Sequence, residues 1–126
     1  MIKTHNMELD VKDGIAYIGI GGRLTETEMS TALDWLGVQT DEHAQFNLCV
    51  TMHKLNMPSL GAAKEELSRL DEVFEMLKSV PKAAVISESQ FIRAAAAIEG
   101  ALIPNLKIKA YETKDRAKAI MWLKAG

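Results

Sequence analysis

Cysteine and proline are both scarce in this chain of 126 residues. Cys49 is the single cysteine, which excludes an internal disulfide and a zinc site built from several cysteines. The three prolines stand singly, and neither a repeat nor a stretch rich in proline, glycine and serine marks a linker. A chain of this length is also the usual size of one domain. We therefore expect a single domain over residues 1–126.

Long apolar runs are absent as well. No segment approaches the ~18 consecutive apolar residues that a membrane-spanning helix needs. The first residues lack the apolar core of a signal peptide. The simplest expectation is a cytoplasmic protein.

The chain has no large excess of charge of either sign, although its charges are unevenly distributed. The formal net charge of −2 disfavours a nucleic-acid partner, because nucleic-acid-binding proteins usually carry a strong basic excess. A hydrophobic fraction of 48% and a charged fraction of 25% are typical of a globular domain. Residues 101–126 nevertheless hold six basic and two acidic side chains, so the end of the chain is locally basic.

The first expected elements are a β-hairpin and a helix. Apolar and acidic residues alternate over Met7–Val11, which is the period of a half-buried strand. Asp13-Gly14 then offers the positive φ angles of a tight turn before a second strand, Ile15–Ile20. Thr25, followed three residues later by Glu28, predicts a capping box at the start of a helix. We expect that helix to end near Gly37.

Helices and strands alternate in the rest of the chain. Strands are expected at residues 45–52, 82–87 and 106–112, and helices begin after Ser59, Ser89 and Thr113. In the last helix we expect Ala117, Ile120 and Met121 to face the sheet. The order predicts an α/β fold with a mixed, mostly parallel sheet of about five strands, an N-terminal hairpin and four helices.

The sequence resembles the SpoIIAA-like family, small bacterial proteins of uncertain function that are related in fold to STAS domains. The resemblance rests on Lys82–Ser87, Phe91, Ile103-Pro104, Lys107–Tyr111, the pattern Ala117-x-x-Ile120-x-Trp122-Leu123, and the turn Gly22-Arg23-Leu24-Thr25. It extends from about Asp13 to the end of the chain. It implies a single STAS-like domain that acts as a binding or interaction module.

The resemblance also implies a candidate phosphoacceptor serine. In regulatory STAS proteins, a serine in an Asp-Ser-Gly-like turn begins the helix after the third strand. The corresponding turn here is Met57-Pro58-Ser59-Leu60-Gly61. The preceding Asp is absent, and the Gly follows Ser59 two residues later instead of one, which is a departure from the regulatory pattern.

Catalytic and metal-binding motifs are not evident. His5, His43 and His53 stand far apart, and none pairs with a Cys, Asp or Glu on one face of an expected helix, as helical metal ligands do. Neither a nucleophile elbow, a dinucleotide fingerprint nor a Walker motif occurs. Cys49 lies in the middle of a strand, which favours a buried and unreactive thiol. We therefore expect no enzyme, no metal and no cofactor.

A first candidate site lies beyond the carboxyl ends of the strands, where open α/β sheets usually bind ligands. The loop before Ser59 is unusually apolar, which suggests that it folds over a ligand. The candidate ligand-binding residues are Met29, Leu33, Trp35, Leu36, His53, Leu55, Met57 and Ser59. They indicate an apolar or lipid-like small molecule, with ordinary core packing and helix capping as the alternative.

A second candidate site is a contact surface for a membrane or a partner. Trp122 is expected to point away from the inward face of the last helix, amid basic side chains. The candidate contact residues are Trp35, Arg116, Lys118 and Trp122. Packing of Trp122 inside the domain is the alternative.

Two functional hypotheses follow. The first is a non-enzymatic module that binds an apolar or lipid-like molecule and associates peripherally with a membrane. The alternative is a STAS-type interaction or regulatory domain, as a homodimer or with a protein partner, in which Ser59 is the phosphoacceptor.

Overall fold

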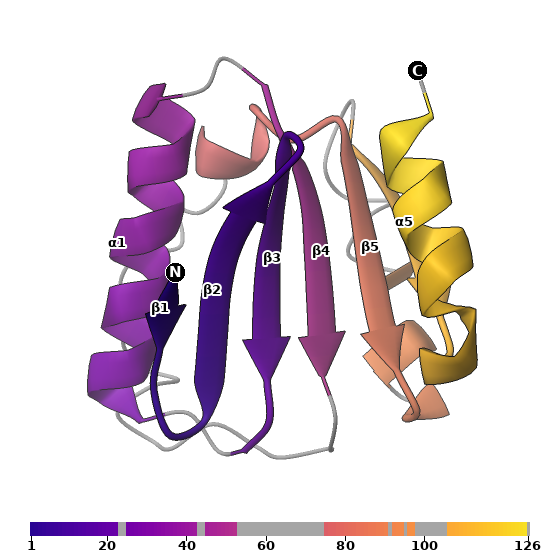
Figure 1. The fold of residues 1–126 in the computed structure, drawn as a ribbon, viewed down its shortest axis with the longest axis horizontal. Coiled ribbons are helices and arrows are strands. Elements are labelled where there is room, and N and C mark those ends of the chain that lie inside the picture. Colours follow the sequence, from indigo (N-terminus) through magenta and orange to yellow (C-terminus); the bar gives the residue numbers. More distant parts are fainter. Residues whose placement is uncertain are drawn as a thin grey trace.

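Six strands form one sheet in the computed structural model, which describes residues 1–22, 25–42, 45–52, 75–90, 92–94, 96–97 and 106–125. The strand order is β1-β2-β3-β4-β5-β6 (Figure 1). The strands are β1 (Ile2–Lys3), β2 (Met7–Lys12), β3 (Ile15–Ile20), β4 (Asn47–Met52), β5 (Lys82–Ser87) and β6 (Lys107–Tyr111). The helical elements with defined bounds are α1 (Glu26–Glu42), the 3-10 turn η1 (Thr113–Asp115) and α5 (Arg116–Lys124).

The sheet is antiparallel at its N-terminal side and parallel elsewhere. The pairs β1–β2 and β2–β3 are antiparallel, whereas β3, β4, β5 and β6 run parallel to their neighbours. Asp13 and Gly14 join β2 to β3 with φ angles of 55° and 76°, so the predicted tight turn is confirmed. The α/β class and the mostly parallel sheet are confirmed, and β1 is a strand that the sequence did not predict.

Helix α1 begins as predicted but ends later. The Glu28 backbone N–H donates to Thr25 Oγ1 at 3.2 Å, and the Thr25 N–H donates to Glu28 Oε1 at 3.2 Å, which is the reciprocal pair of a capping box. The expected end at Gly37 is wrong, because α1 continues to Glu42. A Cβ atom at Gly37 would lie 3.6 Å from Met76 Sδ, so this glycine is a packing position inside the helix.

The two helices cover opposite faces of the sheet. Leu33 and Leu36 of α1 are buried in one core cluster with Ala16 and Leu48. Ala119 and Leu123 of α5 are buried in another cluster, which contains Ile15, Cys49, Ala84 and Ile86. Because side chains alternate between the faces of a strand, Ala16 and Ile15 point to opposite sides of β3. Each face of the sheet therefore has its own core.

The inward face of α5 differs from the prediction. Met121 is 71% exposed and Ala117 is also exposed, whereas Ala119 and Leu123 are 0% and 1% exposed. The expectation for Ala117 and Met121 is therefore wrong. The chain enters α5 directly from the 3-10 turn η1. The residues of α5 that face the sheet are Ala119 and Leu123, a small and a large apolar residue that are four positions apart and therefore lie on the same side of the helix.

Helix α5 covers only part of its face. It packs on β4, β5 and β6, at the far end of the sheet from α1 in Figure 1. On β2, the side chains of Glu8, Asp10 and Lys12 point to the same face and are exposed. The half of this face formed by β2 and β3 is therefore open among the described residues.

Candidate functional site

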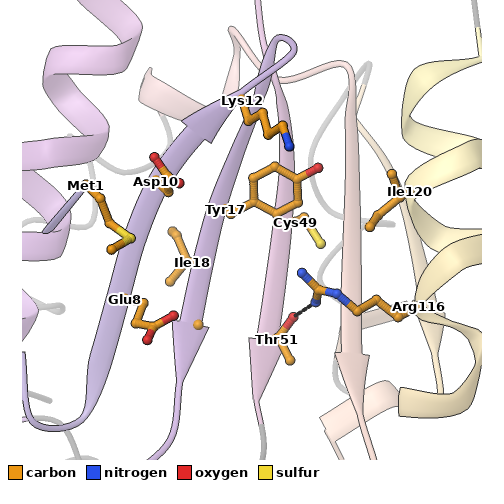
Figure 2. Close-up of a pocket in the computed structure, with 11 residues that line it drawn as sticks. Met1, Glu8, Asp10, Lys12, Tyr17, Ile18, Cys49, Thr51, Arg116 and Ile120 are labelled. Atoms are coloured by element: carbon orange, nitrogen blue, oxygen red, sulfur yellow. Dashed lines mark hydrogen bonds between the residues drawn. The ribbon is translucent and has the colours of Figure 1, made fainter. Parts of the chain in front are cut away.

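A pocket of about 360 Å³ lies between α5 and the open half of the sheet (Figure 2). Its base is made by β2, β3 and β4, and its side wall is made by the first turns of α5. The volume is near the lower end of the range for small-molecule sites. This site is called the α5 pocket below.

Two rows of residues cross the base of the α5 pocket. In one row, Asp10 pairs with Tyr17 and Tyr17 pairs with Cys49. In the other row, Glu8 pairs with Gly19 and Gly19 pairs with Thr51. The second row is hollow at its centre, because glycine has no side chain. A Cβ atom added at Gly19 would find no heavy atom closer than 3.9 Å, so the hollow has room.

Arg116 forms the positive wall of the α5 pocket. It is the first residue of α5, and its Nη1 donates a hydrogen bond of 2.9 Å to Oγ1 of the buried Thr51. Figure 2 shows the guanidinium reaching from α5 over β4. Among the described residues, no carboxylate lies within ion-pair distance of Arg116. The guanidinium group is thus positioned by a hydrogen bond to a neutral hydroxyl group, and no described carboxylate balances its charge.

Neighbouring lysines differ from Arg116 in this respect. The acidic partners of Lys114, Lys118 and Lys124 lie 3.4, 3.8 and 3.5 Å away and are Glu112, Asp115 and Asp13. Arg116 therefore stands out among these four basic residues as the one whose charge is not balanced by a described residue.

The opposite wall is negative. Glu8 and Asp10 lie on the β2 side of the α5 pocket (Figure 2). Tyr17 is beside Asp10, and Gly19 lies between Glu8 and Thr51, to which Arg116 bonds. Glu8 is paired with Lys3 at 3.2 Å. Asp10 accepts a hydrogen bond from the backbone N–H of Val11 at 2.9 Å, and no described cation pairs with it. Opposite charges thus face each other across β3.

The two reactive side chains in the base are neutral near pH 7. Burial raises the pKa of the Cys49 thiol above its ordinary value, against the opposing effects of Arg116 and a hydrogen bond with Thr51. Burial, and then Cys49, raise the pKa of the Tyr17 hydroxyl, and Arg116 opposes them in part. Neither a thiolate nor a phenolate is therefore available as a nucleophile or base.

Metal ligands do not cluster in the part of the chain that the structure describes. No group of three or more His, Cys, Asp or Glu side chains is placed there to hold a metal ion. Within the same segments, no helix has both the length and the apolar character needed to cross a membrane.

The structure separates the predicted ligand-binding residues from the α5 pocket. Leu33 and Leu36 are 8% and 7% exposed in the core beneath α1, and Met29 and Trp35 pack against that core. These four residues have the packing role that was the alternative. The other four predicted residues, His53, Leu55, Met57 and Ser59, lie outside the described residues.

The predicted contact residues do not form one surface. Trp35 belongs to α1, on the opposite face of the sheet from α5. Lys118 is exposed and pairs with Asp115, whereas Arg116 points into the α5 pocket. The four residues therefore face different surroundings.

Trp122 is half-buried and packs against the core cluster that contains Ala119 and Leu123. Its ring centroid lies 5.3 Å from Lys82 Nζ, 5.1 Å from Lys109 Nζ and 6.5 Å from the Tyr111 ring. The Nζ of Lys82 also donates a hydrogen bond of 3.0 Å to the Trp122 carbonyl. Cation–π and aromatic contacts hold the Trp122 ring over β5 and β6, which is the packing role that was given as the alternative.

Sequence reasoning missed most of the α5 pocket. It named Arg116, but it did not name Asp10, Tyr17 or Thr51. One signal was present, since a glycine inside a strand, here Gly19, often marks a place where a ligand or another backbone approaches closely.

Comparisons with known proteins give a fold and a family. No curated protein matches the chain. An uncharacterised protein with a SpoIIAA-like fold, of the DUF3478 family from Shewanella loihica PV-4, is similar in structure, with a TM-score of 0.66 and 16% identity over 98% of each chain. The family described as SpoIIAA-like matches residues 15–124. The resemblance seen in the sequence is confirmed, and the chain belongs to the SpoIIAA-like family.

Proposed function

We propose that this protein is a non-catalytic binding domain that holds a small molecule in the α5 pocket, with an anionic group of that molecule on Arg116. The SpoIIAA-like fold supports a regulatory or interaction domain, for which ligand binding is a suitable task. The observation that carries the proposal concerns the Arg116 guanidinium. Thr51 fixes this group at the side of the pocket, and no described carboxylate forms an ion pair with it.

The chemistry of arginine supports an oxyanion as its partner. The guanidinium is planar, stays charged at all physiological pH values and matches a carboxylate or phosphate with two parallel hydrogen bonds. The hydrogen bond to Thr51 uses Nη1 and restricts the orientation of the group. A fixed guanidinium loses less conformational entropy when a ligand binds, which favours recognition.

The walls of the α5 pocket favour a polar ligand over an apolar one. Four charged side chains line it: Glu8, Asp10, Lys12 and Arg116. Four of the residues behind the apolar-ligand hypothesis, Met29, Leu33, Trp35 and Leu36, pack in or against the core. The other four lie outside the described residues. A lipid ligand and membrane association remain predictions without support from the described residues.

A panel of small carboxylates and phosphates tests the proposal. Isothermal titration calorimetry of the wild type and of Arg116→Gln would compare their affinities, with Lys118→Gln as the matched control on the same helix. We expect at least one compound to bind the wild type and Lys118→Gln alike, and to bind Arg116→Gln at least tenfold more weakly. Equal affinity for Arg116→Gln, or no binding across the panel, would contradict the proposal.

The STAS-type regulatory hypothesis is a second candidate, favoured by the family to which the chain belongs. It requires phosphorylation of Ser59 and a partner that distinguishes the two states. Affinity capture with wild type, Ser59→Ala and Ser59→Asp, read by quantitative mass spectrometry, tests it. A captured partner whose yield changes between Ser59→Ala and Ser59→Asp is expected, and identical yields would remove the switch.

A further inference from the structure

We propose that the ligand of the α5 pocket is a zwitterion of dipeptide type, with its carboxylate on Arg116 and its ammonium group on the β2 wall at Asp10. The inference rests on the proposed function, which places an anionic group on Arg116. It adds to that anionic group a second, positively charged group and an approximate length for the ligand.

Three charged side chains that line this pocket have no described charged partner: Asp10, Lys12 and Arg116. Asp10 and Arg116 are the two of opposite sign that lie on facing walls. Arg116 bonds to the neutral Thr51, and Asp10 accepts a hydrogen bond from the neutral backbone of Val11. Neither forms an ion pair among the described residues, whereas Glu8 on the same wall is already paired with Lys3. A ligand that carries both charges would satisfy both groups at once.

The sheet register sets the separation of the two poles. Asp10 is on β2, with Tyr17 directly beside it on β3 and Cys49 next on β4. Arg116 bonds to Thr51, which is two positions further along β4. Adjacent strands are about 4.8 Å apart, so β2 and β4 are separated by about 10 Å. The offset of two residues along β4 adds to this span, and the Arg116 side chain shortens it by reaching from α5 over β4 (Figure 2). The remaining gap suits a dipeptide, whose charged ends are further apart than those of a single α-amino acid.

The charge balance disfavours a simple polyanion. Glu8 and Asp10 contribute two negative charges to the pocket, and Lys12 and Arg116 contribute two positive charges. A phosphate dianion on Arg116 would also face the carboxylates of the β2 wall. Complementary potentials favour a ligand that is neutral overall but has separated charges.

The centre of the pocket supplies contacts for the body of such a ligand. Tyr17 lies on β3, between the strands that carry Asp10 and Thr51, and Ile120 of α5 lines the same space (Figure 2). The hollow at Gly19 leaves the base open beside the tyrosine ring. A dipeptide backbone can therefore lie across β3 with an apolar side chain against Tyr17.

Modified dipeptides test the inference directly. The probes are alanyl-leucine, its N-acetyl form, which lacks the ammonium group, and its C-terminal amide, which lacks the carboxylate. We expect the unmodified dipeptide to bind the wild type measurably by calorimetry, and each modified form to bind at least tenfold more weakly.

Variants assign each pole to its residue. Asp10→Asn should weaken binding of the unmodified dipeptide at least tenfold, and it should leave binding of the N-acetyl form unchanged. Arg116→Gln should weaken binding of both, and the controls Glu75→Gln and Lys118→Gln should change neither. Thermal unfolding of every variant checks that the fold is intact; for a variant that does not fold, Asp10→Ala or Arg116→Lys replaces it.

The outcomes separate this inference from the proposed function. Equal binding of the N-acetyl and unmodified dipeptides, or binding of panel anions without any dipeptide, overturns the zwitterion and leaves the anion site in place. Dipeptide binding that Arg116→Gln does not weaken overturns both.

Discussion

Glu28 is the residue with the largest number of described hydrogen bonds to its side chain. It is 8% exposed, and its carboxylate accepts hydrogen bonds from Thr4 Oγ1, from Asn6 Nδ2 at 2.9 Å, from the Asn6 N–H at 3.3 Å and from the Thr25 N–H at 3.2 Å. The sequence predicted the Thr25 contact, because a capping box is a local pattern. It did not predict Thr4 and Asn6, because these donors lie more than twenty residues away in the chain.

Acid should destabilise the protein in part through Glu28. Burial raises the pKa of this carboxyl, but hydrogen bonds from Asn6, Thr4 and the backbone outweigh burial and lower it to about 2, below the ordinary value of 4.5. The stabilisation is therefore fully present above about pH 5 and is lost as the pH falls toward 2.

The variant Glu28→Gln isolates this effect. At pH 7 we expect its free energy of unfolding to be lower than that of the wild type by roughly 2 kcal/mol. The difference should shrink steadily between pH 5 and pH 2. Urea denaturation of both proteins over this pH range measures it, and a difference that does not depend on pH would contradict the assignment.

At the scale of elements, the sequence predicted the features that depend on a few adjacent residues. It did not predict the features that depend on packing between elements. The turn at Asp13-Gly14 and the start of α1 follow from backbone preferences of a few adjacent residues. Gly37 does not end α1, and a side chain at this position would contact Met76, a neighbour that the local sequence does not indicate. The inward face of α5 likewise depends on where β4 and β5 lie, and helical spacing alone does not reveal this.

Replacing Gly37 by Ala should stabilise the protein. The position is inside α1, and the new Cβ would meet Met76 Sδ at 3.6 Å, which is an ordinary contact distance. Alanine is favoured over glycine in a helix interior by about 0.5–1 kcal/mol, so the free energy of unfolding should rise by that amount. Thermal or urea denaturation measures the change. A loss of stability would show that the helix and Met76 cannot accept a methyl group.

At the scale of the whole molecule, the α5 pocket is a product of topology. Arg116 meets Thr51, which is 65 positions earlier in the chain, and Asp10 meets Tyr17 across the hairpin. The sequence indicated the polar side of β2 but could not show that α5 leaves this side open. The sequence indicated Arg116 as a contact residue because it lies in the basic end of the chain. That Arg116 lines a pocket follows only from the order of the strands in the sheet.

Filling the hollow at Gly19 should block binding while preserving the fold. A Cβ atom there has no neighbour within 3.9 Å, so valine fits the strand and projects into the α5 pocket. We expect Gly19→Val to unfold at a temperature close to that of the wild type and to bind alanyl-leucine at least tenfold more weakly. Calorimetry and thermal unfolding measure the two effects, and unchanged affinity would show that the ligand does not occupy this hollow.

The most direct test of the account is a map of the residues that respond to the ligand. Titration of ¹⁵N-labelled protein with alanyl-leucine, followed by NMR, reports each backbone amide separately. We predict that the largest chemical-shift changes occur at residues 8–12, 17–19, 49–51 and 116–120, on the strands and the helix that enclose the α5 pocket. Shift changes centred on α1, or none above those seen with the uncharged N-acetyl amide of the same dipeptide, would contradict it.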